Sequence, residues 1–159
     1  MKYTDPIYKE YNEIIQIYKG YNHLYHKIAA GYHLSDSVFD ILYALYWSDH
    51  PCTPSEIVDL CCSRKQTIHS ALKKMEKDAL LSISVSQKNK KNRIVELTAK
   101  GRELAENTVL HSLEAEINAF ARIPEEERET IIRLMGKHLS FFKEEIKKNT
   151  DNNQGTEQK

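Results

Sequence analysis

Four cationic side chains in one short polar segment are the residues best suited to chemistry in this sequence. Lys88, Lys90, Lys91 and Arg93 lie within six residues that contain no acid. Ammonium and guanidinium groups form charge-assisted hydrogen bonds with phosphate oxygens, so their density predicts contact with a polyanion. A solvated surface loop is the other interpretation of such a segment when it is taken alone.

The distribution of charge along the chain favours the polyanion. The 159 residues contain 23 Lys and Arg and 23 Asp and Glu, so the formal net charge is zero. Residues 63–102 hold 11 basic and 3 acidic side chains, whereas residues 1–62 hold 4 and 8, and residues 103–159 hold 8 and 12. A basic centre between two acidic arms indicates one surface for a polyanion and other surfaces for different contacts.

A second basic group precedes the loop, on a helix predicted to begin at Ser63, where the sequence Ser63 to Gln66 has the form of a capping box. The buried face of this helix is expected to comprise Ile68, Ala71, Leu72 and Met75. On the opposite face, Gln66 can hydrogen-bond an adenine edge, while Lys73 and Lys74 can reach phosphates. With the loop included, the predicted DNA-contacting residues are Ser63, Arg64, Lys65, Gln66, Thr67, His69, Ser70, Lys73, Lys74, Lys88, Asn89, Lys90, Lys91 and Arg93.

The elements expected around these residues form a winged helix-turn-helix. Thr53 to Glu56 is a capping box with Pro54 at the first helical position, so a short helix precedes the basic one closely. The segments 82–86 and 93–97 alternate polar and apolar residues, which predicts a β-hairpin with the cationic loop at its tip. Because the basic helix and the basic loop adjoin the same hairpin, the arrangement favours duplex DNA over a merely solvated loop.

Long helices are predicted on both sides of this centre. From Ile7 to about Ala30, apolar side chains recur at spacings of three and four, which predicts a seam that packs in a core or a dimer. The seam consists of Tyr11, Ile14, Tyr18, Tyr21, Tyr25, Ile28 and Tyr32. Further helices are predicted from Ser35 to near Asp49, from Thr98 to about Ala121, and after Pro124. The fold class is therefore mainly α with a small β-hairpin wing, a winged helix-turn-helix with helical dimerisation arms.

The sequence resembles the MarR family of winged helix-turn-helix transcription regulators. The resemblance is carried by the segments 52–57 (CTPSEI), 63–81 (SRKQTIHSALKKMEKDALL), 89–91 (NKK) and 95–101 (VELTAKG). The order of elements extends it over residues 7–148. The family usually has Asp at Asn89, Arg at Lys91 and Gly near Ala79. An Arg-to-Lys change removes planar, multidentate donation, so this wing is expected to bind DNA more electrostatically.

The resemblance implies a homodimer that binds a pseudo-palindromic operator in double-stranded DNA, with its two recognition helices in successive major grooves. Residues 7–33 and 103–148 would form the helical dimerisation region, and residues 34–102 the winged DNA-binding domain. Residues 149–159 contain no apolar side chain and are expected to be disordered. Repression follows simply if the dimer covers a promoter.

Regulators of this kind often respond to a small molecule, and aromatic residues are abundant near the junction of the two regions. A small aromatic effector, such as a flat phenolic compound, would suit rings with polar tips. The candidate ligand-binding residues are Tyr18, Tyr21, Tyr25, Tyr43, Tyr46 and Trp47. Packing in the core is the alternative role for each of them.

The cysteines and histidines give weaker signals. Cys61 and Cys62 precede the basic helix, whose N-terminus could stabilise a thiolate, so a thiol-based redox-sensing regulator is one alternative. Ordinary packing of small apolar side chains is the other. His23, His26 and His111 lack a matched carboxylate, so no metal site is predicted.

Several functional classes are not indicated. The sequence contains no nucleophile, zinc or phosphate-loop motif and only five glycines, so neither an enzyme nor a cofactor is predicted. No apolar run is long enough for a membrane span and no signal segment is evident, so the cytoplasm is the expected location. A winged-helix module for protein–protein contacts remains the alternative to DNA binding.

Overall fold

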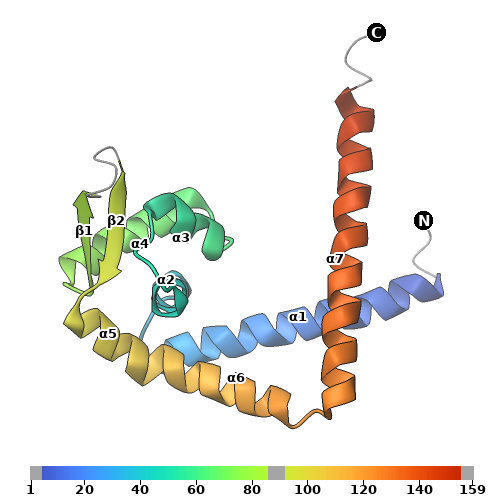
Figure 1. Ribbon diagram of the computed structural model, residues 1–159, viewed down its shortest axis with the longest axis horizontal. Helices are drawn as coiled ribbons and strands as arrows, with labels where there is room; N and C mark the ends of the chain where they lie inside the picture. Colours follow the sequence, from blue (N-terminus) through green and yellow to red (C-terminus); the bar gives the residue numbers. More distant parts are fainter. Residues whose placement is uncertain (1–4, 86–91, 155–159) are drawn as a thin grey trace. The chain divides into compact units, whose positions relative to one another are not determined.

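The computed structural model describes residues 5–85 and 92–154, the side chains as far as Thr150. The chain divides into two compact units, the first ending at Leu113 and the second beginning at Glu114. In chain order (Figure 1) the elements are α1 (Pro6–Gly31), α2 (Asp36–Trp47), α3 (Pro54–Leu60), α4 (Lys65–Lys77), β1 (Leu81–Val85), β2 (Arg93–Leu97), α5 (Ala99–Ala105), the π-helical turn η1 (Glu106–Leu110), α6 (His111–Ala121) and α7 (Glu125–Gln154). This content confirms the predicted fold class.

Helix α1 is long and mostly exposed. Asp5 caps it by accepting a hydrogen bond from the Ile7 amide at 3.0 Å, and Pro6 occupies the first turn, where a missing N–H costs nothing. The helix ends where His33 adopts a φ of 57°, which lets the Leu34 amide donate to the Ala29 carbonyl at 2.9 Å. Ala29 is the only residue of α1 that is buried within the described chain.

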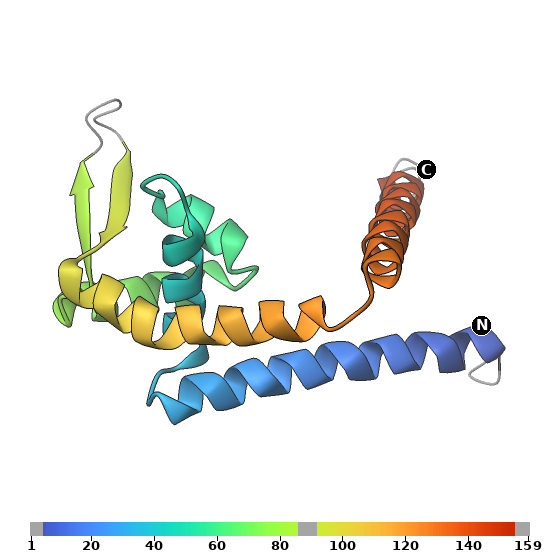
Figure 2. The same cartoon turned by 60° about the horizontal axis from the view of Figure 1, so that its bottom comes forward.

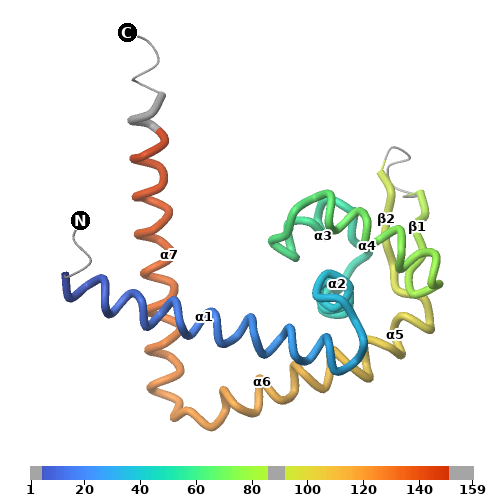
Figure 3. Tube along the Cα trace, turned by 180° about the vertical axis from the view of Figure 1, so that it is seen from behind, coloured from blue at the N-terminus to red at the C-terminus, as the bar shows by residue number. Residues whose placement is uncertain are grey.

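Helix α2 lies at the centre of the first unit. It packs against α1, α3, α4, α5 and β2, and Figures 1 and 3 show it between α1 and the α3–α4 pair. Its residues Val38, Phe39, Ile41 and Leu42 are buried. Ser35 stands at the N-cap, as predicted, but its side chain makes no capping hydrogen bond. One helix therefore supplies the core against which the winged elements are placed.

The two strands form the predicted antiparallel hairpin, with Leu81 opposite Leu97 and Val85 opposite Arg93. They lie side by side at one end of the first unit (Figure 2). The Val95 amide donates to the Cys52 carbonyl at 2.8 Å, so Cys52 forms an isolated β-bridge beside the second strand. The strand pair is thereby fixed to the segment that precedes α3.

The helix predicted from Thr98 to about Ala121 contains a wider turn than expected. The elements α5, η1 and α6 follow one another without a break. Within the π-helical turn, the buried Thr108 hydroxyl donates to the Leu104 carbonyl at 2.7 Å, and the Ser112 hydroxyl donates to the Thr108 carbonyl at 2.9 Å. Side-chain donation to carbonyls one turn back competes with the regular ladder, which accounts for the local widening.

The second unit contains most of α6 and all of α7. Helix α7 continues to Gln154. It therefore extends past Asn149, although the sequence predicts disorder from that residue onward. Most of its large apolar residues are exposed, namely Ile132, Leu134, Met135, Leu139, Phe141, Phe142 and Ile146. No helix in the described ranges is long and apolar enough to cross a membrane.

Candidate nucleic-acid interface

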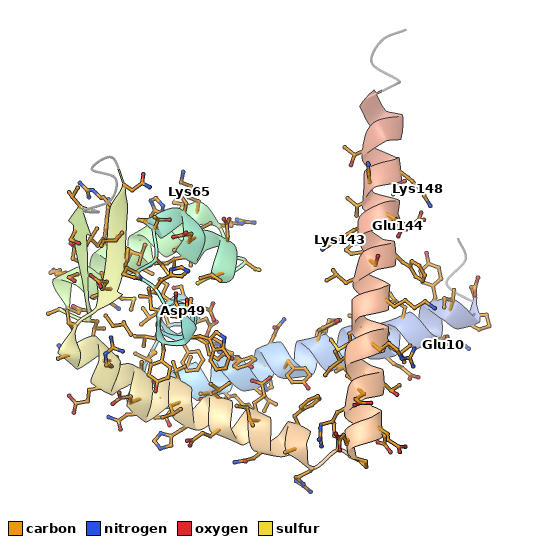
Figure 4. All side chains as sticks on the ribbon, in the orientation of Figure 1. Glu10, Asp49, Lys65, Lys143, Glu144 and Lys148 are labelled. Carbon is orange, nitrogen blue, oxygen red and sulfur yellow. The ribbon has the colours of Figure 1, made fainter. Side chains whose placement is uncertain are left out.

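Helix α4 presents a basic face because its apolar side chains are all turned inward. Ile68, Ala71, Leu72 and Met75 are buried, as the sequence predicts. Of the predicted contact residues on this element, those that are exposed are Arg64, Lys65, Gln66, Thr67, Ser70, Lys73 and Lys74. Figure 4 labels Lys65 at the start of the helix. These predicted residues comprise four cations and three uncharged hydrogen-bonding side chains, and the last turn of α4 adds the exposed Glu76 and Lys77.

The first turn of α4 differs from the sequence-based expectation. The N-cap is Arg64 rather than Ser63, and no side chain caps the helix, so the expected box from Ser63 to Gln66 does not form. The amides of the first turn therefore keep free N–H groups, which together with the helix dipole favour an anion such as a phosphate. A cationic N-cap next to these N–H groups raises the local positive potential further.

Two predicted contact residues are less available than expected. Ser63 and His69 are only partly exposed. The Nε2 atom of His69 is buried, and it has no hydrogen-bond partner within residues 5–85 and 92–154. The buried Nε2 atom is not available to a duplex, whereas contact of DNA with the exposed part of His69 stays a prediction. Periodicity alone places it at the edge of the polar face, where burial depends on neighbouring elements.

Of the predicted wing residues, only Arg93 falls within the described residues, and its side chain is exposed at the start of β2. Lys88, Asn89, Lys90 and Lys91 lie outside them. Arg93 pairs in register with Val85 across the hairpin. Arg93 therefore lies at the end of the hairpin where β1 ends and β2 begins.

Hydrogen bonds connect the turn after α4 to the start of α5. These bonds fix the position of α4 relative to the hairpin that lies between the two helices in the chain. The Thr98 hydroxyl donates to the Ala79 carbonyl at 2.7 Å and accepts from the Gly101 amide at 3.1 Å. The Lys100 ammonium donates to the Asp78 carbonyl at 2.9 Å. A Cβ atom on Gly101 would overlap the Leu80 carbonyl oxygen, so this position requires glycine.

The turn after α4 follows the Schellman pattern. The Leu80 amide donates to the Met75 carbonyl at 2.9 Å, and the Ala79 amide donates to the Glu76 carbonyl at 3.0 Å. Ala79 accordingly has a φ of 56°, in the left-handed region that favours glycine. The MarR family, which the sequence resembles, usually has glycine near this position. Alanine in place of glycine therefore causes backbone strain directly after α4.

A pocket of ≈ 1020 Å³ lies in the first unit, between α1, α2 and α3. Of the six aromatic residues predicted for ligand binding, Tyr25, Tyr43 and Trp47 line it. Tyr18 and Tyr21 are exposed on α1 and, like Tyr46, are not among its lining residues. The structure thus brings together half of the predicted set.

The same pocket contains carboxylates that sequence reasoning did not select. Asp40, Asp49, Glu56 and Asp59 line it, and no Lys or Arg among the described residues does so. Glu56 is already engaged, since its carboxylate accepts from the Thr53 amide at 2.6 Å in the predicted capping box. This hydrogen bond lowers the pKa of Glu56. The acids come from two helices and the loop between them, so only the tertiary arrangement reveals the group.

Cys61 does not have the properties of a thiol that senses oxidants. Burial, aided by the Asp40 charge, raises the pKa of Cys61 to about 12, which disfavours the reactive thiolate. The expected stabilisation by the N-terminus of α4 therefore does not prevail. Cys52 is buried and Cys62 is exposed. Cys62 has a φ of 46° and forms the turn between α3 and α4, which gives it a structural role.

No metal-binding group emerges from the histidines. Within the described ranges, no three His, Cys, Asp or Glu side chains are arranged to hold an ion. His26 instead lies 2.9 Å from the carboxylate of Asp36, where it connects α1 to α2. His111 contacts the Asn107 carbonyl at 3.2 Å.

Solved structures share this arrangement of elements. The chain is similar to Staphylococcus aureus MarR in complex with salicylate and kanamycin, with 24% identity over 86% of this chain and 92% of that one and a TM-score of 0.68. It is similar to the S. aureus MepR–DNA complex, with 19% identity, 83% and 97% coverage and a TM-score of 0.67. It is also similar to Bordetella bronchiseptica BpsR, whose DNA binding is regulated by 6-hydroxynicotinic acid. The identity is 19% over 86% of this chain and 94% of that one, and the TM-score is 0.64.

No protein-family model matches the sequence, and no curated protein does. The likeness is therefore one of structure, and it covers most of the length of each neighbour. The chain has the winged helix-turn-helix fold of MarR-type transcription regulators, which confirms the fold that the sequence predicts.

Proposed function

We propose that the chain is a sequence-specific DNA-binding regulator of transcription, without catalytic activity, and that it represses by covering a promoter. The observation that carries this proposal is the exposed face of α4, where Arg64 and Lys65 lie at an uncapped helix N-terminus and Lys73 and Lys74 lie two turns farther along the helix. Phosphates would bind to these cations and free N–H groups, while Gln66 and Thr67 would reach base edges. A neighbour of the same fold has been solved as a DNA complex.

The proposed protein is a homodimer. The seam residues Tyr11, Tyr18 and Tyr21 on α1 are exposed in the single chain, as is the apolar face of α7. Contiguous apolar surface of this kind is typical of interaction sites rather than of monomers. A second copy of the chain would bring a second α4 to the duplex, as a pseudo-palindromic operator requires.

The pocket between α1, α2 and α3 is the proposed site for an effector. Its walls join α1, which belongs to the proposed dimer arm, to α3, which is the first helix of the helix-turn-helix. A ligand there would change the position of α3 and, through the turn at Cys62, that of α4. Two neighbours were solved with, or are described as regulated by, small aromatic acids.

The test compares the salt dependence of duplex binding by three proteins. Replacing Lys73 and Lys74 by alanine removes two exposed cations of α4, so the slope of log affinity against log salt should become shallower by about 2. The control is Lys143→Ala, which removes an exposed cation from α7 (Figure 4) and should leave the slope unchanged. Equal slopes for all three proteins would refute the proposed surface.

A further inference from the structure

The side chains that line the pocket in the first unit favour a ligand of positive charge. Two features are combined in it, a set of carboxylates and a wall of aromatic rings. Within residues 5–85 and 92–154, His50 is the only basic side chain that lines it. The volume of ≈ 1020 Å³ is large enough for a drug-sized molecule.

The central carboxylate is Asp40 on α2. It is only partly exposed, and it makes no hydrogen bond or ion pair with the part of the chain that the structure describes. Burial and, to a smaller extent, the charge of Asp36 raise its pKa. Proteins rarely leave a half-buried carboxylate without a partner, because its lost hydration is uncompensated. A cation in the pocket would supply the missing compensation.

Asp49 and Asp59 add two further carboxylates at the rim. Both are exposed, and neither forms an ion pair with a Lys or Arg of the described chain. Figure 4 shows Asp49 just beyond the end of α2. Exposed charges are screened by water and salt, so they attract a cation weakly and mainly raise its local concentration.

The aromatic wall favours the same ligand. Phe39 and Tyr25 lie with ring centroids 6.4 Å apart, and Tyr43 and Trp47 also line the cavity. Trp47 is 66% exposed, which is unusual for the largest apolar side chain unless it meets another molecule. The faces of aromatic rings attract cations, and tryptophan does so most strongly.

We infer that this pocket binds an aromatic organic cation, such as a quaternary ammonium compound, and excludes aromatic carboxylates. The inference concerns the ligand class of the effector site proposed above, and only its consequence for transcription rests on the proposed function. The proposed charge is opposite to that of salicylate and 6-hydroxynicotinic acid, the aromatic acids of two neighbours, although one of these neighbours was also solved with the aminoglycoside kanamycin. A carboxylate would be repelled by Asp40, whereas an ammonium group could lie against it and over the Trp47 ring.

The test uses the single tryptophan of the chain as its reporter, because Trp47 itself lines the pocket. The full-length protein is titrated with benzyltrimethylammonium and, separately, with benzoate, while the Trp47 fluorescence is recorded. The cation should produce a saturable change in emission, and benzoate should produce none at the same concentration. Saturable binding of benzoate with equal or higher affinity would overturn the inference, as would no response to the cation.

Variants locate the binding in the pocket. Asp40→Asn should weaken cation binding about tenfold, and Asp49→Asn about twofold, because the second carboxylate is exposed and screened. Glu10→Gln is the matched control, since it removes an exposed acid from α1 outside the pocket and should not change affinity. An equal loss in all three variants would mean non-specific attraction to an acidic surface, which would refute the site.

Stability measurements separate a binding role of Asp40 from a structural one. Asn has nearly the same shape without the poorly hydrated charge, so Asp40→Asn should unfold at the same or a higher temperature than the parent. A lower unfolding temperature would identify Asp40 as a structural residue and would contradict the inference. Duplex binding is measured on the same samples, so failure to bind DNA with intact cation binding would reject the proposed function alone.

Discussion

The winged part of the first unit and the helix α7 use their apolar residues in opposite ways. In the winged part, Ile57, Ile68, Met75 and Val95 are completely buried by neighbouring elements of the same chain. On α7, Ile132 is 63% exposed and Phe142 is 55% exposed. The difference shows that the winged part has a core of its own, whereas the apolar face of α7 is not buried within its own unit.

The first prediction concerns the exposed apolar face of α7 and has the largest expected effect. Leu139 and Phe142 lie three residues apart on α7, and both are exposed in the single chain. Replacing both by lysine would place four charges in the interface of the proposed dimer, which should raise its dissociation constant by about a thousandfold or more. Sedimentation equilibrium measures this constant directly.

The control for that experiment is Lys143→Ala on the same helix. It removes a side chain from an exposed position without adding charge to the apolar face, and it should leave the dimer intact. A parent protein that sediments as a monomer at all concentrations would contradict the dimer.

The second prediction breaks the winged side. Gly101→Ala forces a methyl group onto the Leu80 carbonyl, where the backbone must move, so it should reduce the free energy of unfolding by about 3 kcal/mol. Chemical denaturation monitored by circular dichroism gives the value. Gly20→Ala in α1 provides the contrast, because nothing lies within 4 Å of the added methyl group and alanine is the better helix former. Equal losses in both variants would refute the special role of Gly101.

The third prediction concerns the strained turn at Ala79, where a substitution should increase the free energy of unfolding by a smaller amount than Gly101→Ala decreases it. Ala79 has a φ of 56°, so Ala79→Gly should relieve strain and increase the free energy of unfolding by about 1 kcal/mol. In Ala119→Gly, a helical residue of α6, the same chemical change should instead cost about 1 kcal/mol. If Ala79→Gly destabilised the protein as Ala119→Gly does, the assignment of strain to this turn would be wrong.

Local sequence signals predicted the elements whose determinants lie within a few residues. The Thr53–Glu56 capping box forms with both of its hydrogen bonds, and Thr98 caps α5 as expected. The apolar face of α4 is also buried as its periodicity predicts. These features depend on short-range geometry, which neighbouring elements do not override.

Features that depend on tertiary contact were missed. The start of α4 moved from Ser63 to Arg64, and the partial burial of His69 depends on what packs against the helix edge. The π-helical turn arises from hydroxyl groups that compete for carbonyls, a choice that apolar periodicity does not report. The acids of the pocket lie up to 19 residues apart in the sequence, as Asp40 and Asp59 do, so their proximity requires the fold.

The most direct test of the account is a titration of the full chain with the duplex found upstream of its own gene, against a scrambled duplex of the same composition, at several salt concentrations. The exposed face of α4 combines cations with side chains that read base edges. Sequence-specific binding by this face therefore predicts a preference of about a thousandfold or more for the native duplex, and this preference should persist as salt weakens binding to both duplexes. Equal affinity for the two duplexes at every salt concentration would contradict sequence-specific regulation at this site, and no binding to either would contradict the DNA interface itself.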